Sequence, residues 1–454
     1  MKHMDTLKKV VALAKRRGFI FPGSQIYGGL ANTYDYGPLG VEMLRNLKNY
    51  WWNYFVTTRE NIYGLETSIL MSPKVWQSSG HTKTFTDALI ECKQCHQRTR
   101  ADHLIENKLK NEKVEGQSLE SLEKLINDNK IKCPHCGQFN WTSIRKFNLL
   151  FETKIGIVPK SQSLAYLRGE TAQGMFIDFK QILNTMSPKL PFGLAQSGKC
   201  FRNEITQGQN VFRTLEFELA ELEYYIKQAN WKKEFEFWKK EIEKFALSLG
   251  INKNKLKWRS HTEKELSHYS KKTEDLEYEF PFGFSEWFAC AYRTDFDLKN
   301  HMEKSGIDLR YTDPKSKEKF IPHVIEPTFG LSRTVLVLLV DAYTEEKDRI
   351  VLKLDPKIAP YKVAVSPLLG NKKDLSKKAR KIFKNLSQKF SCAWDAHGNI
   401  GKRYRRQDEA GTPWCVTIDF DSLKDDMVTI RDRDTMKQIR IKTEKLITYF
   451  QEKL

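Results

Sequence analysis

The chain has no long hydrophobic run. Among its 454 residues, no apolar stretch approaches the roughly 20 residues that a helix needs to span a bilayer, so we expect no membrane partner. The amino-terminal sequence MKHMDTLKKVVALAKRRGF is basic and amphipathic, without the apolar core and small-residue cleavage site of a signal peptide. These features predict a cytoplasmic protein.

The chain also has neither a P-loop nor a G-x-G-x-x-G motif, which argues against the nucleotide-binding folds that depend on them. Two arginines stand out instead. Arg202 lies in the segment FRNE and Arg333 lies in GLSR, each next to a predicted strand end or helix start. A planar guanidinium can bind a phosphate through two parallel N–H bonds. Together the two segments indicate ATP bound on an antiparallel sheet.

The eight cysteines do not indicate disulfides in a cytoplasmic protein. Cys92 and Cys95 form one C-x-x-C pair, and Cys133 and Cys136 form a second one after 37 intervening residues. Two such pairs fit a tetrahedral four-cysteine zinc site, and a site with no open position predicts a structural ion rather than a catalytic one. The alternative is an unfilled site that holds free thiols.

The charge balance is strongly basic. A net charge of +19 favours a polyanionic partner, nucleic acid before membrane, although a generally lysine-rich proteome would explain it equally well. Residues 353–454 contain 23 lysines and arginines against 13 acidic residues, so about half of the surplus lies in less than a quarter of the chain.

Length and pattern predict two or three domains. Leu44, Leu47, Trp51 and Phe55 follow helical spacing after Pro38, and this apolar row fits either a subunit contact or simple core packing. We expect a separate unit over residues 91–145 with a solvated or mobile charged middle, and a second, charged and helical insert over residues 230–280. Residues 147–226 and 281–345 read as the strand-rich remainder. After a Pro-marked linker near residues 354–360, alternating strands and helices predict a small α/β domain.

Within Leu215–Tyr225 the apolar residues change from odd to even positions at Ala220. A change of parity within a strand is typical of a β-bulge, which re-aims side chains near a site. We therefore expect a bulge there.

Several segments, in order along the chain, resemble the homodimeric type of glycyl-tRNA synthetase, a class IIa aminoacyl-tRNA synthetase. They cover the chain from near residue 18 to its end. The segments are YDYGPLGVEMLRNLKNYWW, SGHTKTFTDALIECKQCHQRTRADHLIE, LRGETAQGMFIDF, FRNEITQGQNVFRTLEFELAELEYY, RTDFDL, HVIEPTFGLSRTVLVLLVDAY and GKRYRRQDEAGTPWCVTIDFD.

The resemblance implies an α+β fold, in which an antiparallel class II sheet flanked by helices carries insertions. The catalytic domain would span residues 1–352 and a mixed α/β anticodon-binding domain residues 353–454. The implied activity joins glycine to ATP to form glycyl-adenylate, releases pyrophosphate, and transfers glycine to the 3′ end of tRNA(Gly). The family fold would also permit a side activity that makes diadenosine polyphosphates. The helix after Pro38 would lie at the interface of a homodimer.

The resemblance places ATP and Mg²⁺ near the two arginines. Arg202 would bind the α-phosphate and then the adenylate, Phe212 would stack on the adenine, and Arg333 would hold the γ-phosphate, so Arg202 and Arg333 are the expected catalytic pair. Glu286 would contact magnesium or the ribose. The expected ATP contacts are Arg202, Asn203, Glu204, Phe212, Arg213, Glu216, Phe217, Glu286, Trp287, Gly330, Leu331, Ser332 and Arg333.

Selecting glycine requires carboxylates for its ammonium, an arginine for its carboxylate, and no room for a β-carbon. For each glutamate, a structural ion pair is the alternative role, and which of them holds the ammonium is left open. By resemblance, the expected contacts are Arg100, Glu170, Phe217, Glu218, Glu221, Glu326, Thr328 and Gly330.

In the carboxyl-terminal domain, the resemblance suggests RNA phosphate contacts near Trp414. Each basic residue there also fits a solvated surface. The expected contacts are Lys402, Arg403, Arg405 and Arg406.

The sequence departs from the family at some positions. Leu215 and Leu219 replace a usual arginine and glutamine, so no role is transferred to them, and Thr328 stands where serine is usual. One alternative is a related synthetase for alanine or serine. Another is a non-catalytic relative such as the accessory subunit of the mitochondrial DNA polymerase, which the presence of both Arg202 and Arg333 argues against.

Overall fold

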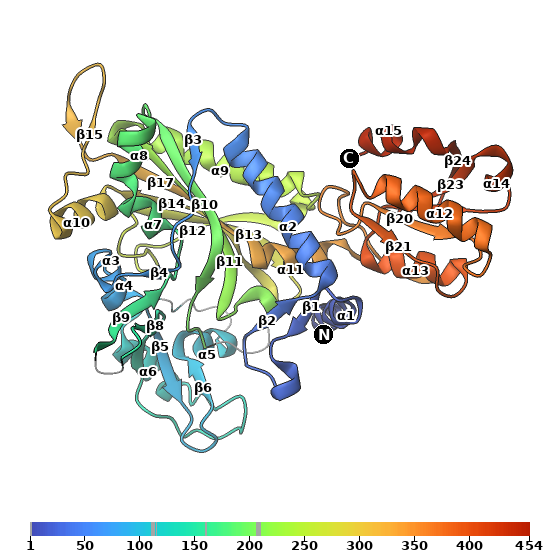
Figure 1. The fold of residues 1–454 in the computed structure, drawn as a ribbon. Coiled ribbons are helices and arrows are strands. Elements are labelled where there is room, and N and C mark those ends of the chain that lie inside the picture. The colour runs from blue at the N-terminus through green and yellow to red at the C-terminus, as the bar shows by residue number, and fades with distance from the viewer. Residues whose placement is uncertain (1, 110–113, 115, 159–160, 206–209) are drawn as a thin grey trace.

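The computed structural model describes residues 2–109, 114, 116–158, 161–205 and 210–454, which form a large body and a smaller carboxyl-terminal body (Figure 1). The large body contains a mostly antiparallel sheet with helices on both faces, and the smaller body contains a second, mixed sheet. The predicted α+β fold is therefore confirmed. Among the helices described, none is both long and apolar enough to cross a membrane.

The main sheet has the strand order β12-β13-β14-β17-β11-β10-β3. β10 and β3 are parallel, and the other neighbouring strands are antiparallel. The strands are β3 (Ile62–Gly64), β10 (Phe192–Phe201), β11 (Glu216–Ile226), β12 (Leu256–Ser260), β13 (Lys272–Phe280), β14 (Gly283–Thr294) and β17 (His323–Gly330).

One face of this sheet, the helix face, packs against α2 (Pro38–Trp52), α9 (Trp231–Ser248) and α11 (Leu331–Ala342) in the largest hydrophobic core (Figure 1). The helix predicted after Pro38 is present as α2. Its apolar row, with Phe55 in the π-helical turn that follows, is buried in this core, so the row packs inside the subunit.

The opposite face, the site face, carries the polar residues described below. At one end it is covered by α7 (Ala172–Ile177), α8 (Phe179–Met186) and α10 (Phe296–Ser305), which pack around Leu194 and Tyr225 in a second core.

The bulge predicted in Leu215–Tyr225 is wrong. β11 keeps a constant register with both β10 and β17, and because nearly all of the strand is buried on both faces, the parity of its apolar residues does not report a change of face. A bulge occurs instead in β14 at Trp287, between the pairs Leu276–Phe288 and Glu277–Glu286. It places the stacked rings of Trp287 and Phe288 together on the helix face and brings Glu286 to the site face.

The expectation of a charged helical insert over residues 230–280 is also wrong. α9 begins this region, but β12 and β13 then complete the edge of the main sheet. The charges that suggested a solvated helix form ion pairs on the sheet. Arg259 lies 3.2 Å from Asp275, 3.1 Å from Glu277 and 2.9 Å from Glu265.

A small unit carries the four cysteines and lies at the bottom of Figure 1. Its charged middle does not form a purely solvated helix, because Leu122 and Ile126 of α6 are buried against Ile90 and Leu104 in a core of their own. The unit has the strand order β6-β5-β7 and comprises β5 (Thr86–Glu91), β6 (Arg98–Arg100), α5 (Ala101–Lys108), α6 (Leu119–Asp128) and β7 (Arg145–Asn148).

The remaining helices and strands complete the large body. They are α1 (Lys2–Arg17), β1 (Ile20–Pro22), β2 (Tyr34–Tyr36), β4 (Leu70–Met71), α3 (Pro73–Ser78), α4 (His81–Thr84), β8 (Phe151–Ile155), β9 (Ser163–Leu167), β15 (Tyr311–Thr312), β16 (Lys319–Phe320), β18 (Tyr343–Glu346) and β19 (Arg349–Leu352).

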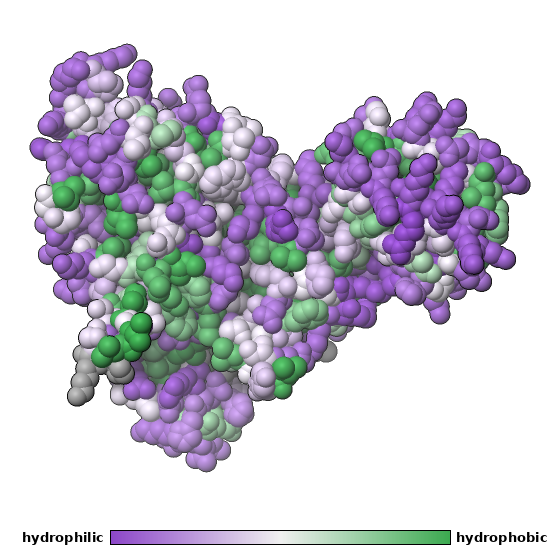
Figure 2. All heavy atoms as spheres, viewed as in Figure 1, coloured by the Kyte–Doolittle hydropathy of each residue, from purple (hydrophilic) through white to green (hydrophobic). Residues whose placement is uncertain are grey.

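The carboxyl-terminal body has the strand order β21-β20-β22-β23-β24 and its own hydrophobic core. Its visible surface is largely hydrophilic (Figure 2). Its elements are β20 (Val363–Pro367), α12 (Lys373–Leu386), β21 (Cys392–Trp394), α13 (Ile400–Ala410), β22 (Trp414–Ile418), α14 (Ser422–Asp425), β23 (Met427–Asp432), β24 (Gln438–Lys442) and α15 (Leu446–Gln451).

A buried carboxylate joins the two bodies. Asp408 of α13 accepts from Arg349 of β19 at 3.0 Å and from Arg431 of β23 at 2.7 and 3.0 Å. Nearby, Arg17 of α1 lies 2.6 Å from Glu409. These ion pairs hold α13 against the large body.

Candidate active site

The site face brings together side chains from four adjacent strands. Glu221 of β11 lies opposite Gln196 of β10 and Thr328 of β17, and Thr328 in turn lies opposite Ala289 of β14. Because alternate residues of a strand share a face, Phe217, Glu221, Glu326 and Thr328 all belong to the site face. Small and polar residues therefore lie at its centre.

Arg202 lies immediately after β10, above Phe217. Its Cζ lies 5.2 Å from the ring centroid of Phe85 and 5.4 Å from that of Phe217, and its Nε donates to the carbonyl of Gly169 at 3.0 Å. Two aromatic rings and a carbonyl therefore fix the orientation of this guanidinium. Such a preorganised cation is suited to binding phosphate.

Arg333, at the start of α11, lies over Phe212, with 4.5 Å between its Cζ and the ring centroid. Its Nη1 donates to the carbonyl of Glu286 at 2.7 Å and lies 3.1 Å from the Glu286 carboxylate. Burial favours a higher pKa for Glu286, but the charges of Arg333 and Arg213 outweigh it and lower the pKa to about 2. Glu286 is therefore an ionised carboxylate at neutral pH.

The segment between β10 and β11 begins at Arg202 and includes Phe212, which lies against Arg333. The backbone N–H of Asn203 donates to the carbonyl of Leu149, and Arg213 forms a 3.4 Å ion pair with Glu204. Residues 206–209, in the loop expected to hold adenine, lie outside the described residues.

A buried acidic pocket lies beside Arg202. Glu221 accepts from the backbone N–H of Thr171 at 2.7 Å and of Ala172 at 3.1 Å, at the start of α7. Glu326 pairs with Arg293 of β14 at 2.7 Å. Glu170 lies 3.4 Å from the same guanidinium, and all three glutamates are buried. Burial raises the pKa of Glu221, and the neighbouring Glu170 raises it further.

The loop between β12 and β13 closes one side of this pocket. Tyr269 lies over the guanidinium of Arg293, and His268 contacts both Ser79 O at 2.8 Å and Thr84 Oγ1 at 2.9 Å. His81, at the start of α4, lies 3.2 Å from Glu170. The segment Ser79–Phe85 and this loop thus support the pocket together.

Several expected ATP contacts point away from this site. Trp287 donates to Thr334 on the helix face, where the bulge places its ring. Ser332 accepts from the backbone N–H of Glu218, and Leu331 is buried in the helix-face core, because both lie on the side of α11 that packs on the sheet. Glu216 is exposed and pairs with Lys199, outside the site.

Two expected glycine contacts also lie elsewhere. Glu218 belongs to the helix face by strand alternation and pairs with Lys48 of α2 at 2.9 Å. Arg100 is buried between Asp87 at 3.1 Å and Asp102 at 2.5 Å in the cysteine unit, so nearby acids occupy its guanidinium. Gly330 lies next to Arg333 at the end of β17.

The four cysteines meet as predicted. Their sulfurs lie within 4.8 Å of one another, with Cys92 Sγ 3.6 Å from Cys136 Sγ and Cys95 Sγ 3.7 Å from Cys133 Sγ. Zn–S bonds of about 2.3 Å in a tetrahedron require sulfurs about 3.8 Å apart, so this geometry fits the ion. The two turns are also alike, since a residue of positive φ follows each pair, at His96 and Gly137.

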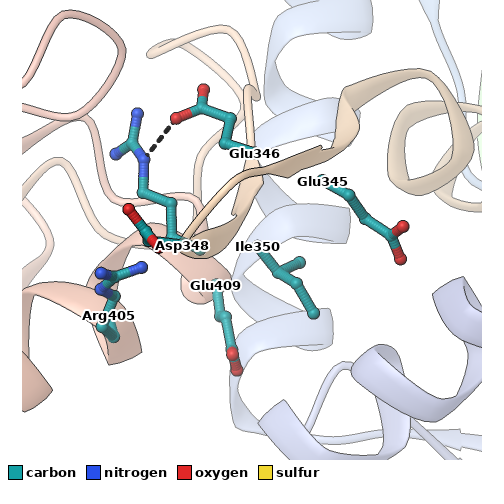
Figure 3. Close-up of a pocket in the computed structure, with 7 residues that line it drawn as sticks. Glu345, Glu346, Asp348, Ile350, Arg405 and Glu409 are labelled. Carbon is teal, nitrogen blue, oxygen red and sulfur yellow. Dashed lines mark hydrogen bonds and ion pairs between the residues drawn. The ribbon is translucent and has the colours of Figure 1, made fainter.

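The expected RNA contacts on α13 divide into two groups. Lys402 and Arg405 are exposed, and Arg405 faces the junction between the two bodies, near Glu409 and the hairpin of β18 and β19 (Figure 3). Arg403 is buried and donates to the carbonyls of Ala396 and Gly398, so it is a structural residue rather than a surface contact.

Arg406 and Trp414 are less available than expected. Arg406 is half-buried, and its guanidinium already pairs with Asp395 at 2.7 Å. Trp414 lies in the domain core instead of on the RNA-facing surface.

Comparisons with known families and proteins agree with this geometry. Residues 160–342 match the tRNA synthetase class II core domain (G, H, P, S and T), residues 362–453 match the anticodon binding domain, and residues 110–149 match the glycyl-tRNA synthetase insertion domain 1. A glycine–tRNA ligase of Clostridium acetobutylicum is 51% identical over 100% of both chains. One of Acetivibrio thermocellus is 52% identical over 100% of this chain and 99% of its own.

The chain belongs to the glycine–tRNA ligase family. It is therefore an aminoacyl-tRNA synthetase. Within this glycine–tRNA ligase, sequence reasoning missed the residues that organise the acidic pocket. Arg293 lies in the segment RTDFDL and His81 in SGHTKTF, and both segments carried the family resemblance, but neither residue had been given a role. Tyr269 was missed because it lies in the region expected to be an insert.

Proposed function

We propose that this chain forms glycyl-adenylate from glycine and ATP on the site face and then transfers glycine to tRNA(Gly). The observation that carries the proposal is the arrangement of Arg202. Its charge interacts with Glu170 and Glu221 of the acidic pocket, which suits an ammonium, and with Glu286, whose partner Arg333 lies over Phe212 and suits a nucleotide.

In the first step, a carboxylate oxygen of glycine attacks the α-phosphorus of ATP. The bond between the α-phosphorus and the bridging oxygen breaks, and pyrophosphate leaves with that electron pair. Arg202, already oriented by Phe85 and Phe217, stabilises the negative charge on the α-phosphoryl oxygens. In the second step, the terminal ribose hydroxyl of the tRNA attacks the activated carbonyl, and AMP leaves. The protein contributes positioning and charge rather than a covalent intermediate.

In this proposal the glycine ammonium lies among Glu170, Glu221 and Glu326. Thr328, opposite Glu221 on the next strand, fills the space that a β-carbon would need. A packed wall of this kind disfavours alanine, because an added methyl group must displace buried atoms.

Glu286, an ionised carboxylate next to Arg333, would hold magnesium, and the ion would offset negative charge on the ATP phosphates. We propose Zn²⁺ for the four cysteines, where it would tie the two C-x-x-C turns together.

A homodimer is proposed from the loop at residues 24–32. Ile26 and Tyr27 are 88% and 87% exposed, and Leu30 is also exposed. In the same loop, the carbonyl of Asn32 accepts from the N–H of Leu215, immediately before β11. A second copy covering this apolar loop would therefore contact the site.

The cytoplasm remains the predicted location, because tRNA is charged where translation takes place. Synthesis of diadenosine polyphosphates remains a predicted side activity.

The proposal is tested by ATP–pyrophosphate exchange with glycine, alanine and serine, each without tRNA. Exchange with glycine alone is expected. Exchange with alanine or serine at a comparable kcat/KM would identify a different substrate, and no exchange with any of them would point to a non-catalytic relative.

A further inference from the structure

Glu223 is a buried carboxyl group in the middle of the site face. It lies on the site face of β11, two residues after Glu221, and is 0% exposed. Within the described part of the chain, neither of its carboxyl oxygens has a hydrogen-bond partner. The hydroxyl of Tyr225, two residues further along the same face, is also unpaired there. An ionised carboxylate in such surroundings is strongly disfavoured.

The surroundings of Glu223 contain more acids than cations. Arg293 is a buried cation of the cluster, and it is already shared by Glu170 at 3.4 Å, Asp297 at 2.9 Å and Glu326 at 2.7 Å. Constant register between β11 and β17 places Glu223 across from Glu326. The ionisable groups that line this cluster are Glu221 and Tyr225 of β11, Glu326 of β17, Arg293 of β14, Asp297 and His301 of α10, Glu170 before α7, His81 of α4, and His268 and Tyr269 of the loop before β13.

We propose that the pair of Glu223 and Glu326 carries one proton while the pocket lacks glycine, and that the arriving glycine ammonium displaces this proton to solvent. The inference rests on the glycine site proposed above. In the free pocket, one proton limits the repulsion between two carboxylates in low dielectric. When the ammonium enters with its own three protons, it supplies the positive charge, and the carboxyl pair loses one H⁺. Glu223 is thus a positioning residue that keeps Glu326 ready to accept the ammonium.

The direction of the pKa shifts agrees with this exchange. Burial raises the pKa of Glu223 well above its ordinary value, and the nearby Glu326 raises it further. Burial also raises the pKa of Glu326 to about 8. Below about pH 8 the free pair therefore holds a proton that the glycine complex lacks, so glycine binding must strengthen as pH rises.

The first test is the pH dependence of KM in ATP–pyrophosphate exchange with the full-length enzyme. Between pH 6 and 8, the KM for glycine is expected to fall by up to about tenfold per pH unit, because one proton is released per glycine bound. The KM for ATP, measured in the same reactions, should not follow this slope. A glycine KM that is flat over this range would overturn the proposal.

The second test uses matched variants and a direct proton count. Calorimetric titration with glycine at pH 7, in phosphate and in Tris, should give heats that differ as expected for about one released proton. Glu223→Gln should bind glycine without proton release and with a flat KM profile, whereas Glu223→Asp should restore both. Proton release that persists unchanged in Glu223→Gln would contradict the role of Glu223.

Different results would contradict the glycine site and the protonation of Glu223 and Glu326. If Glu326→Gln bound glycine normally, the site itself would be wrong. If glycine bound to the wild type at this site without releasing a proton, only the protonation proposed for Glu223 and Glu326 would be wrong. Should Glu223→Gln fail to fold, which an altered ATP KM and circular dichroism spectrum would reveal, the wild-type proton count still decides.

Discussion

Tyr269 lies over the guanidinium of Arg293, with 3.7 Å between the ring centroid and Cζ, and Phe176 lies 5.2 Å from the same group. Because Arg293 holds Glu326 and Glu170, the tyrosine fixes the acidic pocket indirectly. A desolvated cation–π contact stabilises by about 2 kcal/mol. We expect Tyr269→Ala to raise the KM for glycine about tenfold without changing the KM for ATP, whereas Tyr269→Phe keeps the ring and both constants. Equal kinetics for Tyr269→Ala and the wild type would contradict this role.

Arg202 is expected to be essential for adenylate formation. Its aromatic and carbonyl contacts orient it before any substrate binds, so Arg202→Ala removes a preorganised cation from the α-phosphate. The rate of glycine-dependent exchange should fall by about 100-fold or more. The matched control is Arg310→Ala, an exposed arginine that pairs with Asp308 between α10 and β15, which should exchange normally. Normal exchange by Arg202→Ala would show that another group binds the α-phosphate.

The cysteine unit should contain about one zinc ion per chain by elemental analysis, because its sulfur spacing matches a tetrahedral site. Cys95→Ser should lower the zinc content and the temperature at which the unit melts. Cys392→Ser, a cysteine outside the cluster, is the control and should retain the metal. Metal-free protein of unchanged stability would rule out a structural ion.

Asp408 should be important for stability rather than chemistry. Replacing it with asparagine leaves Arg349 and Arg431 without their shared carboxylate in a buried junction. Removing one partner of a buried ion pair costs about 3–5 kcal/mol. Denaturant unfolding should show this loss, while exchange without tRNA should be nearly unchanged in the folded fraction. A variant as stable as the wild type would mean that the junction does not depend on this carboxylate.

Most of the fold could be predicted from the sequence, because its strongest signals lie in local residue patterns and in sequence motifs. The helix after Pro38, the strand ending before Arg202 and the helix starting after Gly330 all occur where expected. The prediction for residues 256–280 was wrong, because the charged residues that form ion pairs on this sheet give the same sequence pattern as a solvated helix. The change of parity in β11 did not indicate a bulge, because β11 is a central strand that is buried on both faces. On each face the polarity of the residues changes along the strand, so apolar residues do not mark one face.

The sequence predicted which residues belong to the site, but it did not predict how these residues are arranged in space. Family resemblance brought Arg202, Arg333, Glu221 and Glu326 into one set, and the structure places them on one face. It could not reveal that Glu218 points to the helix face, since this depends on the register and on Lys48 from a distant helix. Nor could it identify Arg293 as the shared partner of several acids, because that role depends on long-range contacts.

The position of the glycine ammonium can be tested with two KM values, for glycine and for ATP, in ATP–pyrophosphate exchange by Glu326→Gln. Glu218→Gln is the matched control, because the two glutamates lie on opposite faces of the same sheet. We expect Glu326→Gln to raise the KM for glycine by at least about tenfold with the ATP value unchanged, and Glu218→Gln to alter neither. A glycine KM that stays normal in Glu326→Gln, or that rises in Glu218→Gln instead, would contradict the placement of the glycine ammonium on the site face.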